Sequence, residues 1–259
     1  MTASPMLGRP LWYELMTSDL GAAESFYKTI VGWTTAPFDG SPMPYTMWMR
    51  GSVPIGGAMT MPAEMTTMSI PPHWMMYVGT PSLEETVAHV ERLGGMAVSP
   101  VIDVPNVGRM RAMRDPQGAH FSLYQPVSDP HPEAAPQNGD VSWHELMTTD
   151  AVAAKAFYRD LFVWQETSVM DMGPMGSYHM FGRGPLPMGG MMNMPAALAS
   201  VPPHWLYYFQ VPDINAAVER VKANGGQILN GPMEVPGGDW IVQAMDPQGA
   251  AFALHQRKA

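Results

Sequence analysis

The stretch Trp12-Tyr-Glu-Leu-Met-Thr-Ser-Asp19 decides the fold, because it recurs 131 residues later as Trp143-His-Glu-Leu-Met-Thr-Thr-Asp150. Four further blocks recur in the same order, at that offset or two residues beyond it: Phe26-Tyr27 as Phe157-Tyr158, Gly56-Gly-Ala-Met-Thr-Met-Pro-Ala63 as Gly189-Gly-Met-Met-Asn-Met-Pro-Ala196, Pro71-Pro-His-Trp74 as Pro202-Pro-His-Trp205, and Asp115-Pro-Gln-Gly-Ala119 as Asp246-Pro-Gln-Gly-Ala250. Chance does not align so many blocks in order, so the 259-residue chain is a tandem duplication. We expect a first domain at 8–126, a proline-rich linker at 127–140 and a second domain at 141–257.

Each copy is predicted to contain two units of one strand, one helix and three strands. In the first copy, side-chain alternation over 11–17 predicts a strand, and Asp19 can cap the helix that follows. A second strand–helix unit begins at His73, where Ser82-Leu-Glu-Glu85 forms a capping box and Gly94 ends the helix. The other strands are expected near 45–49, 54–61, 98–102, 109–113 and 119–125. The chain is therefore predicted to be an α+β protein with four βαβββ units.

The composition excludes several classes of function. The chain has no cysteine, which excludes disulfides, iron–sulfur clusters, thiolate zinc sites and a cysteine nucleophile. Its formal net charge is −9 and its 14 Lys and Arg form no basic run, so we expect no nucleic-acid partner and no membrane partner. No apolar stretch approaches the roughly 20 residues of a membrane span, and residues 1–10 do not resemble a signal peptide, so a cytoplasmic protein is expected. The 26 methionines indicate either ordinary apolar packing or a soft wall around a planar ligand.

The βαβββ unit, the strand–Asp–helix opening with Phe-Tyr inside the helix, and the Asp-Pro-x-Gly turn before the last strand resemble the vicinal-oxygen-chelate superfamily. That superfamily contains glyoxalases, bleomycin- and fosfomycin-resistance proteins and extradiol dioxygenases. The Trp-x-Glu-Leu, Gly-Gly-x-Met-x-Met-Pro and Pro-Pro-His-Trp blocks are similar to its tandem two-domain, glyoxalase-like branch. The resemblance covers about 8–256 and implies four βαβββ units paired into two open β-barrel-like cups, each with a divalent metal ion on His, Gln or Glu side chains. Since one fold hosts many reactions, the resemblance does not fix the chemistry.

The positions that the resemblance assigns to the metal ligands carry other residues in this chain. They fall on three residues in each copy: Trp12, Met75 and Ser122 in the first, and Trp143, Leu206 and Ala253 in the second. Trp, Met, Leu and Ala supply neither the imidazole nor the hard oxygen donors that these metals use. We therefore expect no metal site and no cofactor. The alternative is one divalent metal ion per domain on displaced ligands, such as Glu14 with His73.

Side chains two apart on a strand share a face, so the neighbours of these positions are expected to line the cups. This gives two Glu–His pairs as candidate catalytic residues, Glu14 with His73 and Glu145 with His204. The candidate ligand-binding residues lie on the same strands: Trp12, Met75, Tyr77 and Tyr124 in the first copy, and Trp143, Leu206, Tyr208 and His255 in the second. A Glu facing a His can be a general base, a hydrogen-bonding handle for a ligand or a structural pair. The two histidines can also hold their turns through backbone hydrogen bonds.

These features favour a protein that takes a small apolar or aromatic molecule into its cups without a metal ion. It would act as a binder of the resistance type, or as a metal-independent lyase or isomerase. The alternative is a divalent-metal-dependent enzyme of the glyoxalase or dioxygenase type with displaced ligands. A third interpretation is a scaffold whose duplication only builds a stable fold. Internal duplication supplies the partner that single-domain relatives gain by dimerising, so monomer and homodimer both stay open.

Overall fold

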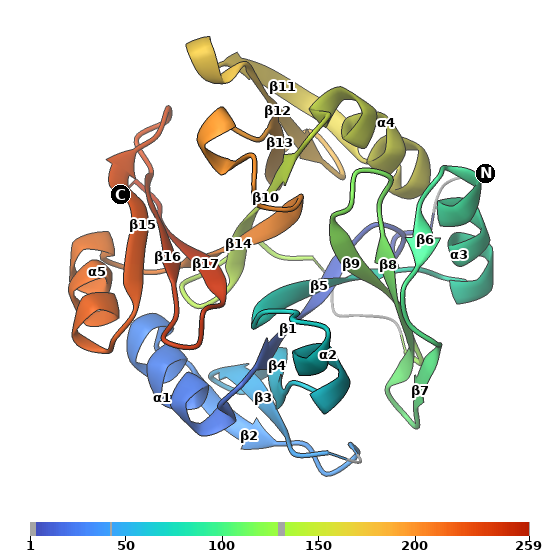
Figure 1. Ribbon diagram of the computed structural model, residues 1–259, viewed down its shortest axis with the longest axis horizontal. Coiled ribbons are helices and arrows are strands. Elements are labelled where there is room, and N and C mark those ends of the chain that lie inside the picture. The colour runs from blue at the N-terminus through green and yellow to red at the C-terminus, as the bar shows by residue number, and fades with distance from the viewer. Residues whose placement is uncertain (1–3, 42, 129–132, 259) are drawn as a thin grey trace. The chain divides into compact units, whose positions relative to one another are not determined.

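The computed structural model describes residues 4–41, 43–128 and 133–258 (Figure 1). The first copy contains, in chain order, β1 (Pro10–Thr17), α1 (Leu20–Val31), β2 (Thr34–Pro37), β3 (Tyr45–Arg50), β4 (Val53–Thr60), α2 (Ala63–Thr67), β5 (His73–Gly79), α3 (Leu83–Arg92), β6 (Met96–Ala97), β7 (Ile102–Val104), β8 (Gly108–Arg114) and β9 (His120–Pro126). The second contains β10 (Val141–Thr148), α4 (Ala151–Phe162), β11 (Gln165–Asp171), β12 (Ser177–Gly182), β13 (Gly189–Asn193), β14 (His204–Gln210), α5 (Ile214–Ala223), β15 (Gln227–Glu234), β16 (Trp240–Met245) and β17 (Ala251–Gln256), with short 3-10 turns at Gly173–Met175 and Ala196–Leu198.

Each copy forms one mixed sheet that stays open. The strand order is β2-β3-β4-β1-β5-β9-β8-β6 in the first copy, with β7 paired to β8, and β11-β12-β13-β10-β14-β17-β16-β15 in the second. Both orders begin and end on different strands, so neither sheet closes into a barrel. The predicted α+β class and the four βαβββ units are confirmed. Within the described residues, no helix combines the length and the apolar character that crossing a bilayer requires.

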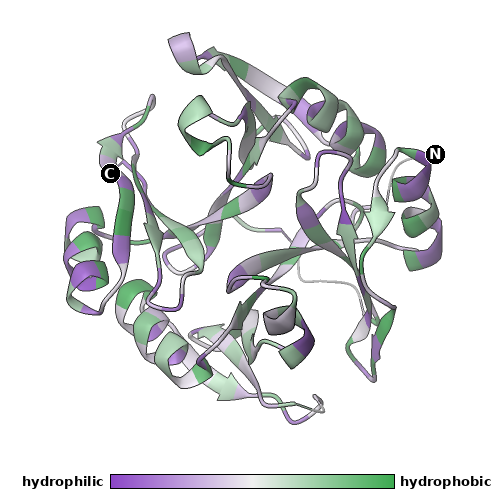
Figure 2. Ribbon diagram, in the orientation of Figure 1, coloured by the Kyte–Doolittle hydropathy of each residue, from purple (hydrophilic) through white to green (hydrophobic). Residues whose placement is uncertain are grey.

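The chain packs into two compact units, and each unit takes elements from both copies. The first compact unit is Met1–Leu11, Met76–Glu133 and His144–Trp205, and the second is Trp12–Met75, Ala134–Trp143 and Leu206–Ala259. Within the second unit α1 and α5 lie side by side, and within the first unit α3 contacts α4 (Figure 1). Figure 2 shows hydrophobic and hydrophilic residues mixed along these helices, as expected for helices that bury one face.

The core of the second compact unit is built around Tyr27 on α1, which is fully buried. Its hydroxyl donates to Asp246 Oδ2 at 3.0 Å and accepts the indole N–H of Trp74 at 2.9 Å. Its ring packs against six aromatic rings at centroid distances between 5.1 and 6.2 Å: Phe26, Trp33, Trp48, Trp74, Phe209 and Phe252. Aromatic packing of this kind excludes water from the Tyr27 hydroxyl and strengthens both hydrogen bonds.

The first compact unit repeats this core around Tyr158 on α4. The Tyr158 hydroxyl donates to Asp115 Oδ2 at 3.0 Å and accepts the indole N–H of Trp205 at 3.1 Å. Its ring contacts five others at centroid distances between 4.9 and 6.2 Å: Phe121, Phe157, Phe162, Trp164 and Trp205. In both units the tyrosine and the aspartate come from different copies, so each core joins one copy to the other.

The Asp-Pro-Gln-Gly turn owes its form to the same aspartate. Asp115 Oδ1 accepts the backbone N–H groups of Gln117, Gly118 and Ala119 at 2.8–3.0 Å. Gly118 has φ +113°, which a residue with a side chain rarely adopts. Burial raises the pKa of Asp115 and of Asp246 against the effect of these hydrogen bonds. The repeated Phe-Tyr, His-Trp and Asp-Pro-Gln-Gly blocks therefore meet in the cores, and their repetition reflects structure.

The two predicted helix caps are confirmed, whereas one predicted strand is not. Asp19 Oδ1 accepts the N–H of Ala22 and caps α1, and Ser82 Oγ accepts the N–H of Glu85 at the start of α3. The expectation of a strand near 98–102 is wrong, because β6 ends before this segment and β7 begins at its last residue. Pro100 has no N–H to donate to a ladder, and the Ser99 hydroxyl accepts the N–H of Ala112 instead.

The C-terminal end of the predicted linker packs within the second compact unit. The indole N–H of Trp33 donates to the carbonyl of Gly139 at 2.8 Å. Arg50 Nε donates to Asp140 Oδ1 at 2.6 Å. Residues 129–132 of the predicted linker lie outside the described residues. Its C-terminal end is therefore held by specific contacts.

Candidate functional site

The buried carboxylate of Glu14 on β1 is held by a tyrosine of the second compact unit, and that tyrosine is held by a tryptophan. The hydroxyl of Tyr45 on β3 donates to Glu14 Oε2 at 2.9 Å. The indole N–H of Trp12 donates to the Tyr45 oxygen at 2.8 Å. Trp12 and Glu14 share one face of β1 because they are two residues apart, and Glu14 is only 6% exposed. Glutamates are almost never buried to this extent unless they are paired.

The second copy contains the same pair within the first compact unit. The hydroxyl of Tyr178 on β12 donates to Glu145 Oε2 at 3.0 Å, and Glu145 is 7% exposed. We call Glu14–Tyr45 and Glu145–Tyr178 the two Glu–Tyr pairs. Their repetition in both copies indicates that the chain keeps a carboxylate and a phenol together at this position of each sheet.

The repeated Gly-Gly block makes room for the tyrosine ring in each pair. Glu14 lies beside Gly57 in the parallel register of β1 and β4, and Glu145 lies beside Gly190 in that of β10 and β13. A Cβ atom at Gly57 would lie 2.2 Å from the hydroxyl oxygen of Tyr45, and one at Gly190 would lie 2.1 Å from Tyr178 ring carbons. Only glycine leaves room for the ring to approach the strand this closely and reach the carboxylate.

A carboxylate held by a phenol has two chemical uses in a site of this kind. It can hold a polar group of a ligand through a charge-assisted hydrogen bond. It can also exchange a proton with a ligand, with the phenol completing the relay. In the first copy the indole of Trp12 donates to the phenol oxygen, which makes the Tyr45 hydroxyl a better donor to Glu14.

The two candidate catalytic histidines hydrogen-bond to the turns that precede them. His73 Nδ1 lies 2.8 Å from the carbonyl of Pro71, and His204 Nδ1 lies 2.9 Å from the carbonyl of Pro202. Since a carbonyl only accepts, each Nδ1 carries the proton and donates it. Burial lowers the pKa of His73, so its ring stays neutral at pH 7. A pairing of either glutamate with its histidine stays a prediction.

The residues at the three metal-ligand positions of the second copy pack together as apolar neighbours. Leu206 and Ala253 form a buried cluster with Tyr208, and Trp143 packs against it. Leu206 and Ala253 carry no donor atom for a metal ion, and the indole nitrogen of Trp143 is a hydrogen-bond donor only. The residues present therefore do not fit the metal site of the resemblance. In the described part of the chain, no three His, Asp or Glu side chains gather closely enough to hold an ion.

The corresponding positions of the first copy are also poor metal ligands. The indole N–H of Trp12 is committed to Tyr45. Met75 is 6% exposed, and Ser122, at 2%, donates to the carbonyl of Leu123 at 3.4 Å. A thioether and a neutral hydroxyl are weak ligands for the divalent ions that prefer imidazole and carboxylate.

The remaining candidate ligand-binding residues make defined ring contacts and hydrogen bonds. Tyr77 and Tyr124 pack edge to face with ring centroids 6.5 Å apart, and the Tyr124 hydroxyl donates to the carbonyl of Val107 at 3.1 Å. Tyr208 accepts the side-chain amide of Gln243 at 2.9 Å. The two ring nitrogens of His255 bond to Ser142 Oγ and Asp239 Oδ2. A role of these residues in ligand binding stays a prediction.

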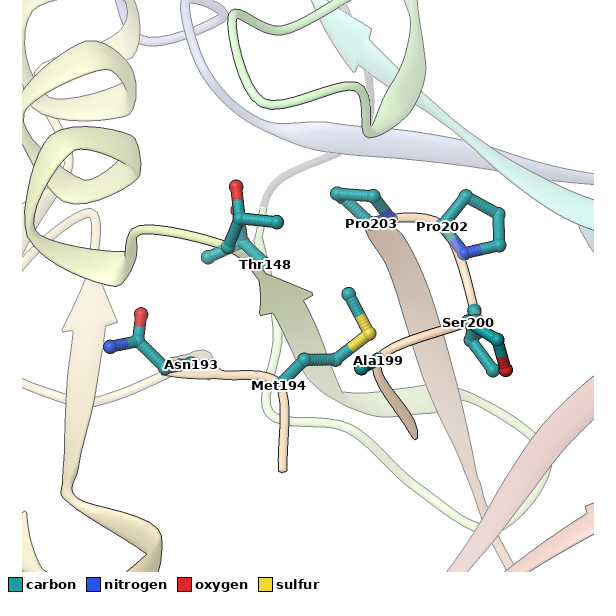
Figure 3. Close-up of a pocket in the computed structure, with 9 residues that line it drawn as sticks. Thr148, Asn193, Met194, Ala199, Ser200, Pro202 and Pro203 are labelled. Atoms are coloured by element: carbon teal, nitrogen blue, oxygen red, sulfur yellow. The ribbon is translucent and has the colours of Figure 1, made fainter. Parts of the chain in front are cut away.

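A cavity of about 460 Å³ lies beside the C-terminal end of β10 in the first compact unit (Figure 3). In Figure 3 the Met194 side chain extends toward Ala199. None of the lining side chains is charged: Thr148, Thr149, Asn193, Met194, Ala199, Ser200, Val201, Pro202 and Pro203. None of the predicted site residues lines it, although His204 follows Pro203 directly.

Tyr45 and Tyr178 are members of the candidate site that the sequence analysis missed. They recur at the same offset as the Gly-Gly block, so the repeat itself contained the signal. β3 and β12 are not among the strands that carry metal ligands in the superfamily, so strand parity did not single out their tyrosines. These tyrosines reach across a glycine to the carboxylate.

Comparisons with known proteins agree with this architecture. The family model described as the Glyoxalase/Bleomycin resistance protein/Dioxygenase superfamily matches residues 141–254, and a model described as a glyoxalase-like domain matches 13–124. Solved structures share the fold: a substrate complex of homoprotocatechuate 2,3-dioxygenase from Brevibacterium fuscum has a TM-score of 0.69 at 13% identity over 99% of this chain and 82% of that one. The Mn(II)-bound glyoxalase from Novosphingobium aromaticivorans has a TM-score of 0.66 at 14% identity over 97% and 82%.

Two relatives match along nearly the whole chain. CFP32 of Mycobacterium tuberculosis (strain CDC 1551 / Oshkosh), whose name assigns it provisionally to the glyoxylases, is 31% identical over 95% of this chain and 94% of its own. The anthracycline biosynthesis protein DauV of Streptomyces sp. (strain C5) is 28% identical over 95% and 92%. The chain belongs to the glyoxalase/bleomycin resistance protein/dioxygenase superfamily, in its tandem two-domain form.

Proposed function

We propose that this protein binds a small apolar, aromatic molecule at its two Glu–Tyr pairs, without a metal ion. In this proposal each glutamate holds a hydroxyl group at the edge of the ligand, or moves a proton on it. The protein then acts as a binder or as a metal-independent lyase or isomerase. The observation that carries the proposal is the buried Glu–Tyr pair, present in both copies with a glycine beneath each ring.

The apolar residues at the metal-ligand positions support a ligand held without an ion. In the second copy Leu206, Ala253 and Trp143 pack together in a buried apolar cluster. Aromatic carbon that is removed from water against apolar side chains gains about 25 cal/mol for each Å². A few polar groups set in an apolar wall are typical of small-molecule sites, where the polar groups fix the orientation of the ligand.

The names of two relatives support an aromatic ligand. DauV and DnrV, which are 28% and 27% identical to this chain over 95% of its length, are both named anthracycline biosynthesis proteins. Anthracyclines are polycyclic aromatic molecules with phenol and carbonyl groups along their edges. A carboxylate and a phenol at the wall of an apolar site suit such edges.

The test is a fluorescence titration with 1,4-dihydroxyanthraquinone, a planar probe that carries both phenol and carbonyl groups. The probe should quench the fluorescence of Trp12 and Trp143, each two residues from a paired glutamate. The Glu14→Gln/Glu145→Gln variant removes both charges and should weaken binding about tenfold or more, the value of a charge-assisted hydrogen bond. Glu64→Gln on α2 is the matched control, because Glu64 is exposed.

Three results would count against the proposal. If the probe does not quench the tryptophan fluorescence, the hypothesis of an aromatic ligand is contradicted. Unchanged affinity in the double variant would remove the Glu–Tyr pairs from the site. Stoichiometric metal in the purified protein, with function lost on chelation, would favour the divalent-metal-dependent enzyme with displaced ligands.

A further inference from the structure

Three polar side chains of the second compact unit form a hydrogen-bonded chain that the proposed function does not use. Ser142 Oγ lies 2.7 Å from His255 Nδ1, and His255 Nε2 lies 2.9 Å from Asp239 Oδ2. The backbone N–H of Lys258 donates to the other oxygen of Asp239 at 2.8 Å. The carboxylate is thus held in place, and it holds the imidazole in turn.

The donors and acceptors fix where the protons lie. The carboxylate of Asp239 only accepts, so His255 Nε2 carries the ring proton and donates it. Burial lowers the pKa of His255, which keeps the ring neutral at pH 7 and leaves Nδ1 as an acceptor. Ser142 therefore donates its hydroxyl proton to Nδ1. The other acceptor near Ser142 Oγ, the carbonyl oxygen of Tyr208, is farther away at 3.3 Å.

The first copy has no counterpart of this chain. The residues 131 positions earlier are Leu11, Gly108 and Tyr124, which cannot form it. The first copy builds the same sheet without these hydrogen bonds, so the fold does not require them. All three groups are present together only in the second copy, so the duplication itself does not account for them.

Ser142 and His255 are nearly closed off from water. Ser142 is 8% exposed and His255 is 7% exposed, so a small part of each still reaches the surface. Bringing a charged group to such a buried position costs free energy, because the group loses its hydration. An uncharged substrate with a small acyl group suits these surroundings.

We propose that Ser142 is a nucleophile for acyl transfer from uncharged carboxylic esters, with His255 as its general base and Asp239 as a positioning residue. Ser142 Oγ attacks the ester carbonyl carbon while its proton passes to His255 Nδ1. The carbon–oxygen bond to the alcohol breaks, and the alcohol leaves with that proton. Water, deprotonated by the same Nδ1, then cleaves the acyl-serine, which releases the carboxylic acid and restores Ser142 with its proton.

The experiment uses the full chain with p-nitrophenyl acetate as substrate and a fluorophosphonate as a covalent probe. The probe should modify Ser142, as read by mass spectrometry of the labelled peptide. Ser142→Ala and His255→Gln should each lower kcat at least about a hundredfold, the usual contribution of a general base and its nucleophile. Asp239→Asn should lower kcat with little change in KM, because it acts through His255. Ser177→Ala, at an exposed serine, is the matched control and should match the wild type.

The proposal fails if the probe modifies a different residue or none, or if folded Ser142→Ala retains the wild-type rate. Circular dichroism establishes that each variant is folded. Should Ser142→Ala fail to fold, the labelled peptide of the wild-type protein decides the question by itself. Neither result depends on anthraquinone binding, so failure here is distinguishable from failure of the proposed function.

Discussion

Replacing Tyr27 with phenylalanine removes a single oxygen atom from the core of the second compact unit. That oxygen donates to the Asp246 carboxylate and accepts from the Trp74 indole. A hydrogen bond to a charged group contributes about 1.5–3 kcal/mol, and one between neutral groups about 0.5–1.5 kcal/mol. We therefore expect Tyr27→Phe to lower the free energy of unfolding by about 3 kcal/mol. In a chain of this size that corresponds to a fall in Tm of roughly 6–12 °C.

The assay is denaturant unfolding at pH 7, with Tyr124→Phe as the matched control. The chemical change is identical, but the Tyr124 hydroxyl makes one described hydrogen bond, to a neutral backbone carbonyl. This control should lower the free energy of unfolding by about 1 kcal/mol. Tyr158→Phe should lower the free energy of unfolding as much as Tyr27→Phe, because it breaks the equivalent hydrogen bonds to Asp115 and Trp205 in the first compact unit. If Tyr27→Phe and Tyr124→Phe lower the free energy of unfolding by the same small amount, the structural role given to the repeated motifs is refuted.

Two further predictions concern a buried histidine and the glycine beneath a Glu–Tyr pair. Burial lowers the pKa of His144 to about 4, while its ring donates to the carbonyl of Met188. Between pH 6.5 and pH 4 the unfolded chain then binds more protons at this residue than the folded one. The free energy of unfolding should fall by about 3 kcal/mol as the pH drops through that window, and His144→Asn should remove this part of the slope in denaturant melts; an unchanged slope would contradict it. Gly190→Ala should push the Tyr178 ring off Glu145, lower the free energy of unfolding by about 1–3 kcal/mol and weaken probe binding. Gly184→Ala should change neither stability nor probe binding, because a Cβ atom there meets nothing within 4 Å.

The fold was predictable because it depends on signals that repeat. Several motifs that recur in the same order indicate a duplication. Side-chain alternation indicates strands, and capping residues such as Asp19 indicate where helices begin. What the sequence concealed was the use of the motifs. Phe26-Tyr27 and Asp246 lie far apart in the chain, and only tertiary packing shows that they share one hydrogen-bond network. The error near 98–102 has a local cause, since Pro100 interrupts a run that is otherwise typical of a strand.

The candidate site was predicted in part. Strand parity singled out Glu14 and Glu145 as residues of interest, but parity cannot indicate which donor reaches a carboxylate from a neighbouring strand. That donor is Tyr45 or Tyr178, and each needs a glycine beneath its ring to approach. The chain of Ser142, His255 and Asp239 was also beyond sequence reasoning, because its members come from separate segments of the second copy.

Anthraquinone titration of protein dialysed exhaustively against chelator tests the central claim most directly, with residual metal measured on the same sample. We expect probe affinity to equal that of untreated protein while the metal content is far below one ion per domain. Binding that disappears with the metal, and returns when a divalent ion is restored, would contradict the account.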